Sequence, residues 1–242
     1  MMNSEMTFFE HLAELRARLL VVFFTIIFFS LLGYIYSEKI IEILLNSSKS
    51  SISDFQVIYI TTMFMIKINI AIFSGIVFSF PVLFYNILMF LKPAFKSNLS
   101  FIKVLTFVLF SIFLFLIGIL FGYFVLIPTS VNFFNSISLD LLGSVSLNYT
   151  LENYLIYLCW ILLISSTIYQ VPILLLLLAK IGILDITTLK NKRSYVIIGF
   201  FILAAFLTPP DPFSQFLVAL PMIILYEITI FIIKIFFKND KI

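Results

Sequence analysis

Long apolar stretches without charged residues alternate with short polar segments along the whole chain. A helix needs about 20 apolar residues to cross the hydrocarbon core of a bilayer. Runs of that order, uncharged except for Glu227 in the last, predict six membrane-spanning helices, over residues 19–37, 68–91, 104–127, 153–179, 194–208 and 213–233. The fifth run has only about 15 residues, which predicts a tilted helix or a locally thinned bilayer.

Prolines predict where several of these helices end or bend. Pro128 is expected to close the third span and Pro172 to kink or end the fourth, because proline has no amide hydrogen to donate within a helix. The segment from Thr208 to Pro212 contains three prolines and must turn between the last two spans. Asp211, inside this turn, is expected to cap the sixth helix. The pattern predicts an all-α membrane protein that forms a single domain over residues 1–242.

The composition agrees with a lipid environment and excludes several classes of function. Hydrophobic residues make up 62% of the chain, charged residues only 11%, and the mean hydropathy is +1.19. A single cysteine, Cys159, and a single histidine, His11, cannot form an intramolecular disulfide, a thiolate metal site or a bis-histidine haem site. No glycine-rich phosphate loop occurs, and the net charge of +3 is too small and scattered for nucleic-acid binding. We therefore expect neither a cofactor nor a metal ion, and no nucleic-acid partner.

The basic residues are unevenly divided between the two sides that six spans define. One side holds Lys39, Lys49 and Lys67. The side shared by both termini holds the other 12, namely Arg16, Arg18, Lys92, Lys96, Lys103, Lys180, Lys190, Lys192, Arg193, Lys234, Lys238 and Lys241. Because basic residues accumulate on the cytoplasmic side of membrane proteins, both termini are predicted to face the cytoplasm, the mitochondrial matrix or the stroma.

The residues before the first span predict an amphipathic helix. Apolar side chains recur there at helical spacing: Phe8, Leu12, Leu15 and Leu19. Glu10, Glu14 and Arg18 lie on another face, and Glu14 and Arg18 have the i, i+4 spacing of an ion pair. The pattern alone is typical of a helix that lies on the membrane surface and anchors the first span. Alternatively, the two glutamates offer an acidic surface to a basic ligand.

Gln170 and Glu227 are the candidates for a functional polar group within the predicted spans, where a charge costs roughly 2.5 to 3.5 kcal/mol at the bilayer centre. Gln170 precedes Val171 and Pro172, so a polar side chain coincides with an expected helix break. It is expected either to hydrogen-bond a neighbouring helix or to mark a functional site. Glu227 lies about two turns from Lys234 and is expected to snorkel or to form an ion pair at the interface.

Several motifs occur in a fixed order along the chain. They read HLAELRARL at residues 11–19, FLKPA at 90–94, LTPPDPFSQ at 207–215 and YEI at 226–228. Together they resemble the TatC family, the polytopic core subunit of the twin-arginine protein translocase. The resemblance extends along nearly the whole chain.

The resemblance implies a receptor and scaffold without enzymatic chemistry. Members of this family fold as a concave, glove-like bundle of six helices, which binds the twin-arginine signal peptide of folded cargo on the cytoplasmic side. Small single-span subunits of the TatA and TatB type assemble with it, and the proton-motive force drives transport. A homo-oligomer is also expected.

Site residues carry over from the family by position. Glu14 would pair with a signal-peptide arginine through charge-assisted hydrogen bonds. Arg16, Phe90 and Pro93 belong to the same surface, and Glu10 is a candidate for a second acid there.

The family also implies roles for the last two helices. Thr208 and Gln215 would contact the membrane span of a partner subunit. The turn that contains Pro209, Pro210 and Asp211 would hold the two helices in a rigid hairpin.

The chain departs from the family pattern at two acidic positions. The loop after residues 90–94 reads KSNLS at 96–100, without the second signal-peptide glutamate that the family usually carries. Gln170 stands where the family has a glutamate before Val-Pro. The chain also contains 31 phenylalanines, a bias toward amino acids with AT-rich codons that is typical of an organellar genome. This bias and the two losses favour the mitochondrial inner membrane over a plastid thylakoid or a bacterial inner membrane.

Two other functions are compatible with an apolar six-span chain. A small-solute or ion transporter would be expected to show repeated halves and paired ionisable residues at mid-membrane, and this sequence shows no repeat and only Gln170 at depth. A structural subunit of a respiratory complex would not explain the amphipathic N-terminal segment or the TPPD block.

Overall fold

The computed structural model describes residues 8–47, 55–95, 100–142, 149–208 and 212–236, nearly all of them helical. The main helices are α1 (Phe8–Ile35), α3 (Thr62–Leu91), α4 (Phe101–Phe121), α5 (Ile127–Leu142), α6 (Leu151–Ile168), α7 (Val171–Ile181), α9 (Arg193–Leu207) and α10 (Pro212–Phe236). Shorter elements are α2 (Ser37–Asn46), α8 (Ile186–Asn191), a 3-10 turn at Lys92–Ala94 and a π-helical turn at Gly122–Leu126. Two-residue strands, β1 (Phe55–Gln56) and β2 (Tyr149–Thr150), pair in parallel. The prediction of an all-α fold is confirmed apart from this short pair.

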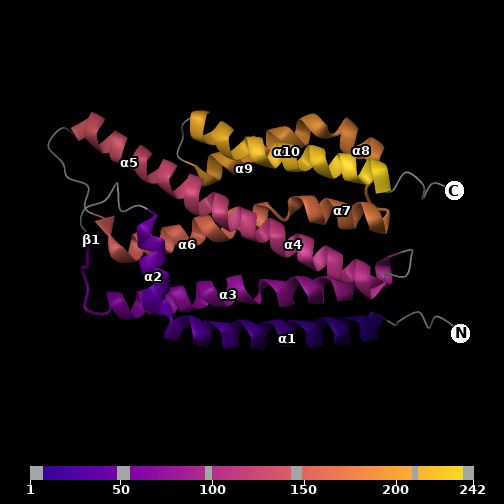
Figure 1. The fold of residues 1–242 in the computed structure, drawn as a ribbon, viewed down its shortest axis with the longest axis horizontal. Helices are drawn as coiled ribbons and strands as arrows, with labels where there is room; N and C mark the ends of the chain where they lie inside the picture. The colour runs from indigo at the N-terminus through magenta and orange to yellow at the C-terminus, as the bar shows by residue number, and fades with distance from the viewer. Residues whose placement is uncertain (1–7, 48–54, 96–99, 143–148, 209–211, 237–242) are drawn as a thin grey trace, which may run out of the picture.

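Within the described residues, five helical runs are long and apolar enough to cross a membrane. They are Phe9–Ile35, Thr62–Leu91, Phe101–Ser136, Leu151–Ile181 and Gln215–Ile235. The predicted fifth span corresponds to α9, whose 15 residues extend only about 22 Å, against a hydrocarbon core of about 30 Å. The start of α1, the end of α3 and the end of α10 lie at the same end of the molecule (Figure 1).

Two boundaries differ from the sequence prediction. The amphipathic N-terminal segment and the first span form one continuous helix, α1, so the segment continues the span and is not a separate helix. Pro128 does not close the third span, because α5 continues through it to Leu142. A π-helical turn at Gly122–Leu126 precedes this proline and already displaces the regular i→i−4 hydrogen bonds, so the missing amide of Pro128 disrupts little.

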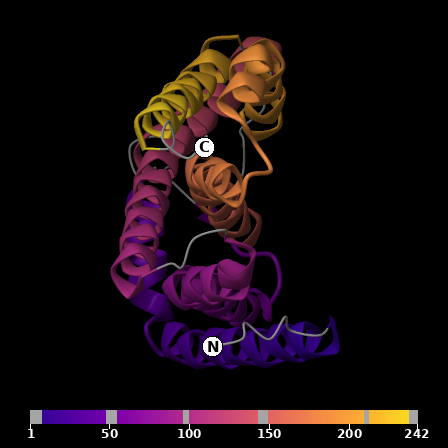
Figure 2. The same ribbon diagram turned by 90° about the vertical axis from the view of Figure 1, so that its right-hand side faces the viewer.

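The helices are arranged in an arc and do not form a closed bundle (Figure 2). The α1–α3 pair lies at one end of the arc and the α9–α10 pair at the other, with α4 running between them. Leu155 and Leu158 of α6 are fully buried in the main hydrophobic cluster. The arc is consistent with the concave bundle that the family resemblance implies.

Glycines and serines bring two helix pairs into close contact. Gly33 of α1 faces Ser74 of α3, and Gly75 of α3 faces Ser30 of α1, so a Cβ on either glycine would overlap the opposite serine. Gly118 of α4 lies against the backbone of α6. Small residues are favoured at membrane helix interfaces because they let backbones approach closely.

At the end of the molecule opposite the chain termini, α2 is tied to its neighbours by polar contacts. Lys67 Nζ of α3 donates to Glu38 Oε1 of α2 over 2.8 Å. This hydrogen bond and the lysine charge lower the pKa of the Glu38 carboxyl below its ordinary value. Tyr123 Oη, from the π-helical turn, donates to the carbonyl of Ile43 over 2.7 Å. These contacts hold α2 across the ends of α3 and the π-helical turn.

Candidate functional site

The beginning of α1 and the end of α3 form a polar site at one end of the molecule (Figure 1). His11, Glu14 and Arg18 are three and four residues apart, so they share one face of α1. The Arg18 guanidinium donates to Glu14 Oε1, with a distance of 2.9 Å from Nε. Both side chains are 22% exposed, so the ion pair is partly withdrawn from solvent. The i, i+4 pairing predicted for these two residues is confirmed.

The second carboxylate oxygen of Glu14 differs from the first. Oε2 is buried, and within the described residues it has no hydrogen-bond partner. His11 Nδ1 lies 3.7 Å away, which is too long for a hydrogen bond. The His11 ring stacks on the Phe90 ring of α3, with 4.2 Å between the ring centroids and 14° between the planes. We refer to Glu14, Arg18, His11 and Phe90 as the Glu14 site.

An unpartnered carboxylate oxygen is a strong acceptor in need of a donor. Removing such a group from water without a hydrogen bond costs about 1 to 3 kcal/mol or more. A hydrogen bond from a ligand to Oε2 would therefore contribute more binding free energy than a hydrogen bond to an exposed carboxylate oxygen. The Glu14 site is thus suited to bind a cationic, hydrogen-bonding group beside an aromatic ring.

A cavity of about 250 Å³ lies between α1 and α3, next to the Glu14 site. It is lined by Leu15, Arg18, Leu19, Val22, Leu83, Asn86, Ile87, Phe90 and Leu91. Arg18 and Phe90 belong both to this α1–α3 cavity and to the Glu14 site.

The other residues predicted for signal-peptide binding lie on the surface around this site. Glu10 and Arg16 are exposed on α1, and Pro93 is exposed in the 3-10 turn that follows α3. Arg16 is two residues from Glu14, so the two side chains leave α1 in different directions. The loop segment 96–99, which lacks the family's second glutamate, is outside the described residues.

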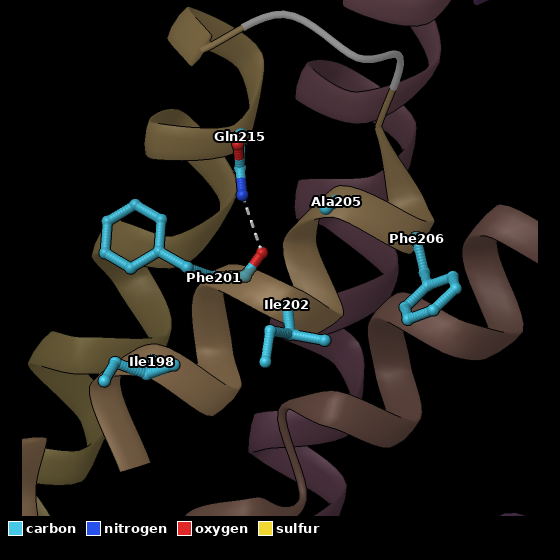
Figure 3. Close-up of a pocket in the computed structure, with 6 residues that line it drawn as sticks. All are labelled: Ile198, Phe201, Ile202, Ala205, Phe206 and Gln215. Carbon is cyan, nitrogen blue, oxygen red and sulfur yellow. Dashed lines mark hydrogen bonds between the residues drawn. The ribbon is translucent and has the colours of Figure 1, made fainter. Parts of the chain in front are cut away.

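A second candidate site lies on the hairpin formed by α9 and α10. A cavity of about 500 Å³ is lined by Ile198, Phe201, Ile202, Ala205, Phe206 and Gln215. Gln215 reaches from α10 and donates from Nε2 to the carbonyl of Phe201 over 2.9 Å (Figure 3). Thr208 is buried and donates to the carbonyl of Ala204 within its own helix over 2.8 Å. Of the two residues predicted to contact a partner span, the structure thus places Gln215 in the cavity wall and Thr208 beneath the surface.

Gln170 lies at the break between α6 and α7. It accepts from Ser111 Oγ of α4 over 2.6 Å, and its Nε2 donates to the Ser111 carbonyl over 3.3 Å. Pro172 is buried in the first turn of α7, and the predicted helix break at this point is confirmed. Of the two interpretations left open, hydrogen bonding to a neighbouring helix is the one that the structure supports.

Glu227 of α10 pairs with a residue that the sequence analysis did not consider. Arg193 Nε, at the start of α9, lies 2.6 Å from Glu227 Oε1. The expected ion pair is present, and its partner is Arg193 on the adjacent helix. Pro209, Pro210 and Asp211, including the predicted cap, are outside the described residues.

Sequence reasoning missed His11 in the Glu14 site and Asn86 in the α1–α3 cavity. His11 was considered only as a metal or haem ligand, although its i, i+3 spacing from Glu14 already places both on one helix face. The sequence does not mark Asn86 as a site residue, because a polar residue in an apolar run can also be satisfied by a hydrogen bond within its own helix. The structure shows such a bond, from Asn86 Nδ2 to the carbonyl of Val82 over 2.8 Å.

The fold and these sites define a multi-pass helical membrane protein that carries a partly buried acidic group at one end and an apolar cavity on its final hairpin. Comparison with known proteins identifies the family. The chain belongs to the TatC family, since the sequence pattern of the family described as Sec-independent protein translocase protein (TatC) matches residues 10–221. It is therefore a subunit of the twin-arginine translocase.

Individual relatives match over almost the whole chain. The Sec-independent protein translocase protein TatC of Desulforapulum autotrophicum is 32% identical over 236 residues, covering 96% of this chain and 86% of that protein. The tatC-like protein ymf16 of Reclinomonas americana is 34% identical over 239 residues, covering 96% and 88%. A crystal structure of the twin-arginine translocase receptor TatC superposes with a TM-score of 0.77 at 28% identity, covering 92% of this chain and 99% of that one.

Proposed function

We propose that this subunit is the signal-peptide receptor and scaffold of the translocase, and that Glu14 binds an arginine of the signal peptide. The observation that carries the proposal is the buried Oε2 of Glu14 beside the Phe90 side chain, an oxygen that accepts no hydrogen bond from any residue the structure describes. A guanidinium group is planar, always charged and rich in donors, and it stacks on aromatic faces. It can donate to Oε2 while Arg18 keeps Oε1.

The second arginine of the peptide requires another acceptor, because the loop at 96–100 contains no acid. We assign this role to Glu10, which is exposed one helical turn before Glu14 on α1. Arg16 and Pro93 border the same surface.

The proposal predicts that the receptor distinguishes arginine from lysine. A fluorescent peptide with a pair of arginines should bind the purified protein in lipid nanodiscs about tenfold more tightly than the same peptide with a pair of lysines. Both peptides carry the same charge, so the difference reports the bidentate and stacking geometry that only guanidinium provides. Fluorescence anisotropy gives both dissociation constants. Equal affinities would contradict recognition of arginine at this site.

We propose that the α9–α10 hairpin binds a single-span partner of the TatA or TatB type. Exposed apolar residues are ordinary on a lipid-facing helix, but the cavity also contains the polar Gln215, which a partner helix can reach. Tyr195, Ile198, Ile202 and Phe206 lie along one exposed face of α9. Thr208 ends α9 by bonding to its last turn and so fixes where this face stops.

Cysteine cross-linking tests this docking face. In a Cys159→Ala background, Ile202→Cys should form disulfide adducts with a partner that carries cysteine in its span. The matched variant Ile72→Cys should not, because Ile72 is also exposed but lies on α3 at the other end of the arc. Equal adducts from both positions, or adducts only between copies of this chain, would count against the assignment.

We further propose the setting in which the subunit works. The protein is an integral multi-pass membrane protein, and 12 of its 15 basic residues fall on the side of the termini, which supports a cytoplasmic or matrix location for both ends. The missing loop acid and the composition support the mitochondrial inner membrane. The subunit would act without catalysis of its own, assemble with further copies of itself, and couple transport to the proton-motive force through its partners.

A further inference from the structure

The α1–α3 cavity extends from the Glu14 site along α1 and α3 toward the middle of both helices. Leu15, Leu19 and Val22 form its wall on α1. The antiparallel helix α3 supplies the facing residues, from Phe90 to Leu83. Seven residues of α-helix rise about 10 Å, so the cavity follows both helices over about that length.

The walls of the cavity require no polar partner from an occupant. Most of them are aliphatic or aromatic. Asn86 already donates to the carbonyl of Val82, and Arg18 already donates to Glu14. An apolar group can therefore fill the space without leaving a donor or acceptor of the wall unsatisfied.

One end of the cavity is shared with the Glu14 site. Arg18 hydrogen-bonds Glu14 and also lines the cavity, and Phe90 stacks with His11 and also lines it. An extended peptide advances about 3.3 Å per residue, so one to three residues beyond an arginine on Glu14 lie over the cavity. Signal peptides carry their positive residues before an apolar segment, so apolar side chains are present at that distance.

We propose that the α1–α3 cavity binds an apolar side chain of the signal peptide, from the residues immediately after its arginines. This inference rests on the proposed function, because it requires the peptide arginine on Glu14. It adds a second recognition element, in which the charge fixes the arginine and the cavity reads the start of the apolar segment. A peptide that carries arginines without adjacent apolar residues would use only the first element.

A double substitution, one in the protein and one in the peptide, tests the proposal. Val22→Phe places a ring in the cavity, whereas Val21→Phe adds the same ring at the neighbouring exposed position, outside the cavity. Each variant is titrated in nanodiscs with the paired-arginine peptide and with a version whose three residues after the arginines are serine.

The proposal predicts strong coupling between the two changes. Val22→Phe should lower the affinity for the paired-arginine peptide about tenfold. It should lower the affinity for the serine peptide less than about twofold, because the serine peptide no longer places an apolar side chain in the cavity. Val21→Phe should leave both affinities unchanged. The proposal would be overturned if Val22→Phe lowered the affinity for both peptides by the same factor, or if it did not lower the affinity for the paired-arginine peptide. The latter is also the result expected if a lipid acyl chain fills the cavity.

A measurement on the unaltered protein guards against misfolding of the variants. A peptide with a benzophenone side chain immediately after the arginines should label residues 15–22 of α1 or 83–91 of α3, as mapped by mass spectrometry. Labelling confined to other segments would overturn the proposal.

The paired-lysine peptide separates the cavity assignment from the proposed function. If arginine specificity is present while coupling and labelling are absent, only the cavity assignment fails. If arginine specificity itself is absent, the proposed function fails.

Discussion

Replacement of Glu14 by glutamine is expected to weaken binding of the paired-arginine peptide by about tenfold to a hundredfold. A hydrogen bond to a charged group contributes about 1.5 to 3 kcal/mol, and the buried Oε2 is the acceptor assigned to the peptide. Glutamine keeps the size and shape of the side chain, so the packing between α1 and α3 is preserved. Fluorescence anisotropy in nanodiscs measures the loss.

Two controls make the Glu14→Gln result specific. Glu10→Gln removes an exposed carboxylate one helical turn from Glu14. It should lower the affinity for the peptide less than Glu14→Gln does, because solvent screens the interactions of an exposed charge. The arginine-to-lysine preference should also shrink in Glu14→Gln but persist in Glu10→Gln. Unchanged peptide affinity in Glu14→Gln would remove this residue from the binding site.

Replacement of Gly118 by alanine is expected to destabilise the fold by about 1 to 3 kcal/mol. The new Cβ would lie 2.6 Å from Ser166 Cα and 3.1 Å from the Ser165 carbonyl oxygen, and these backbone atoms cannot turn aside as a side chain can. Separation of α4 and α6 would also break the hydrogen bond from Ser165 Oγ to the Gly118 carbonyl, now 2.8 Å. The lone cysteine provides the measurement, because a thiol-reactive dye reaches buried Cys159 only when the protein unfolds.

Gly199→Ala is the matched control for Gly118→Ala. Gly199 is also in a helix, but a Cβ there would meet no atom within 4 Å. Because alanine favours helix over glycine, this variant should be neutral or slightly stabilising. A similar fall in unfolding temperature for both variants would show that the close α4–α6 contact is not what makes Gly118→Ala costly.

The features that the sequence predicted well are those determined by local periodicity and solvation. Apolar runs of membrane-spanning length predicted the helical fold, and the proline after Gln170 predicted the break between α6 and α7. The Glu14–Arg18 pair was predictable because both residues are on one helix, where spacing alone fixes their separation.

The features that the sequence did not predict depend on contacts between helices. Glu227 was compared with Lys234 on its own helix, but it pairs with Arg193, which only the packing of α9 on α10 brings near. The stacking of His11 on Phe90 depends in the same way on the crossing of α1 and α3. Pro128 does not end its helix as predicted, because the π-helical turn before it already displaces the hydrogen bonds that a proline would otherwise break.

The packing of α1 has a mechanical consequence for the receptor site. α1 packs chiefly on α3, and Gly33 lies in close contact with Ser74, about 28 Å along the helix from Glu14. With that contact as a pivot, a change of one degree in the crossing angle moves Glu14 by about 0.5 Å relative to Phe90. A small rotation at this contact is thereby amplified at the other end of α1, where it changes the spacing between Glu14 and Phe90.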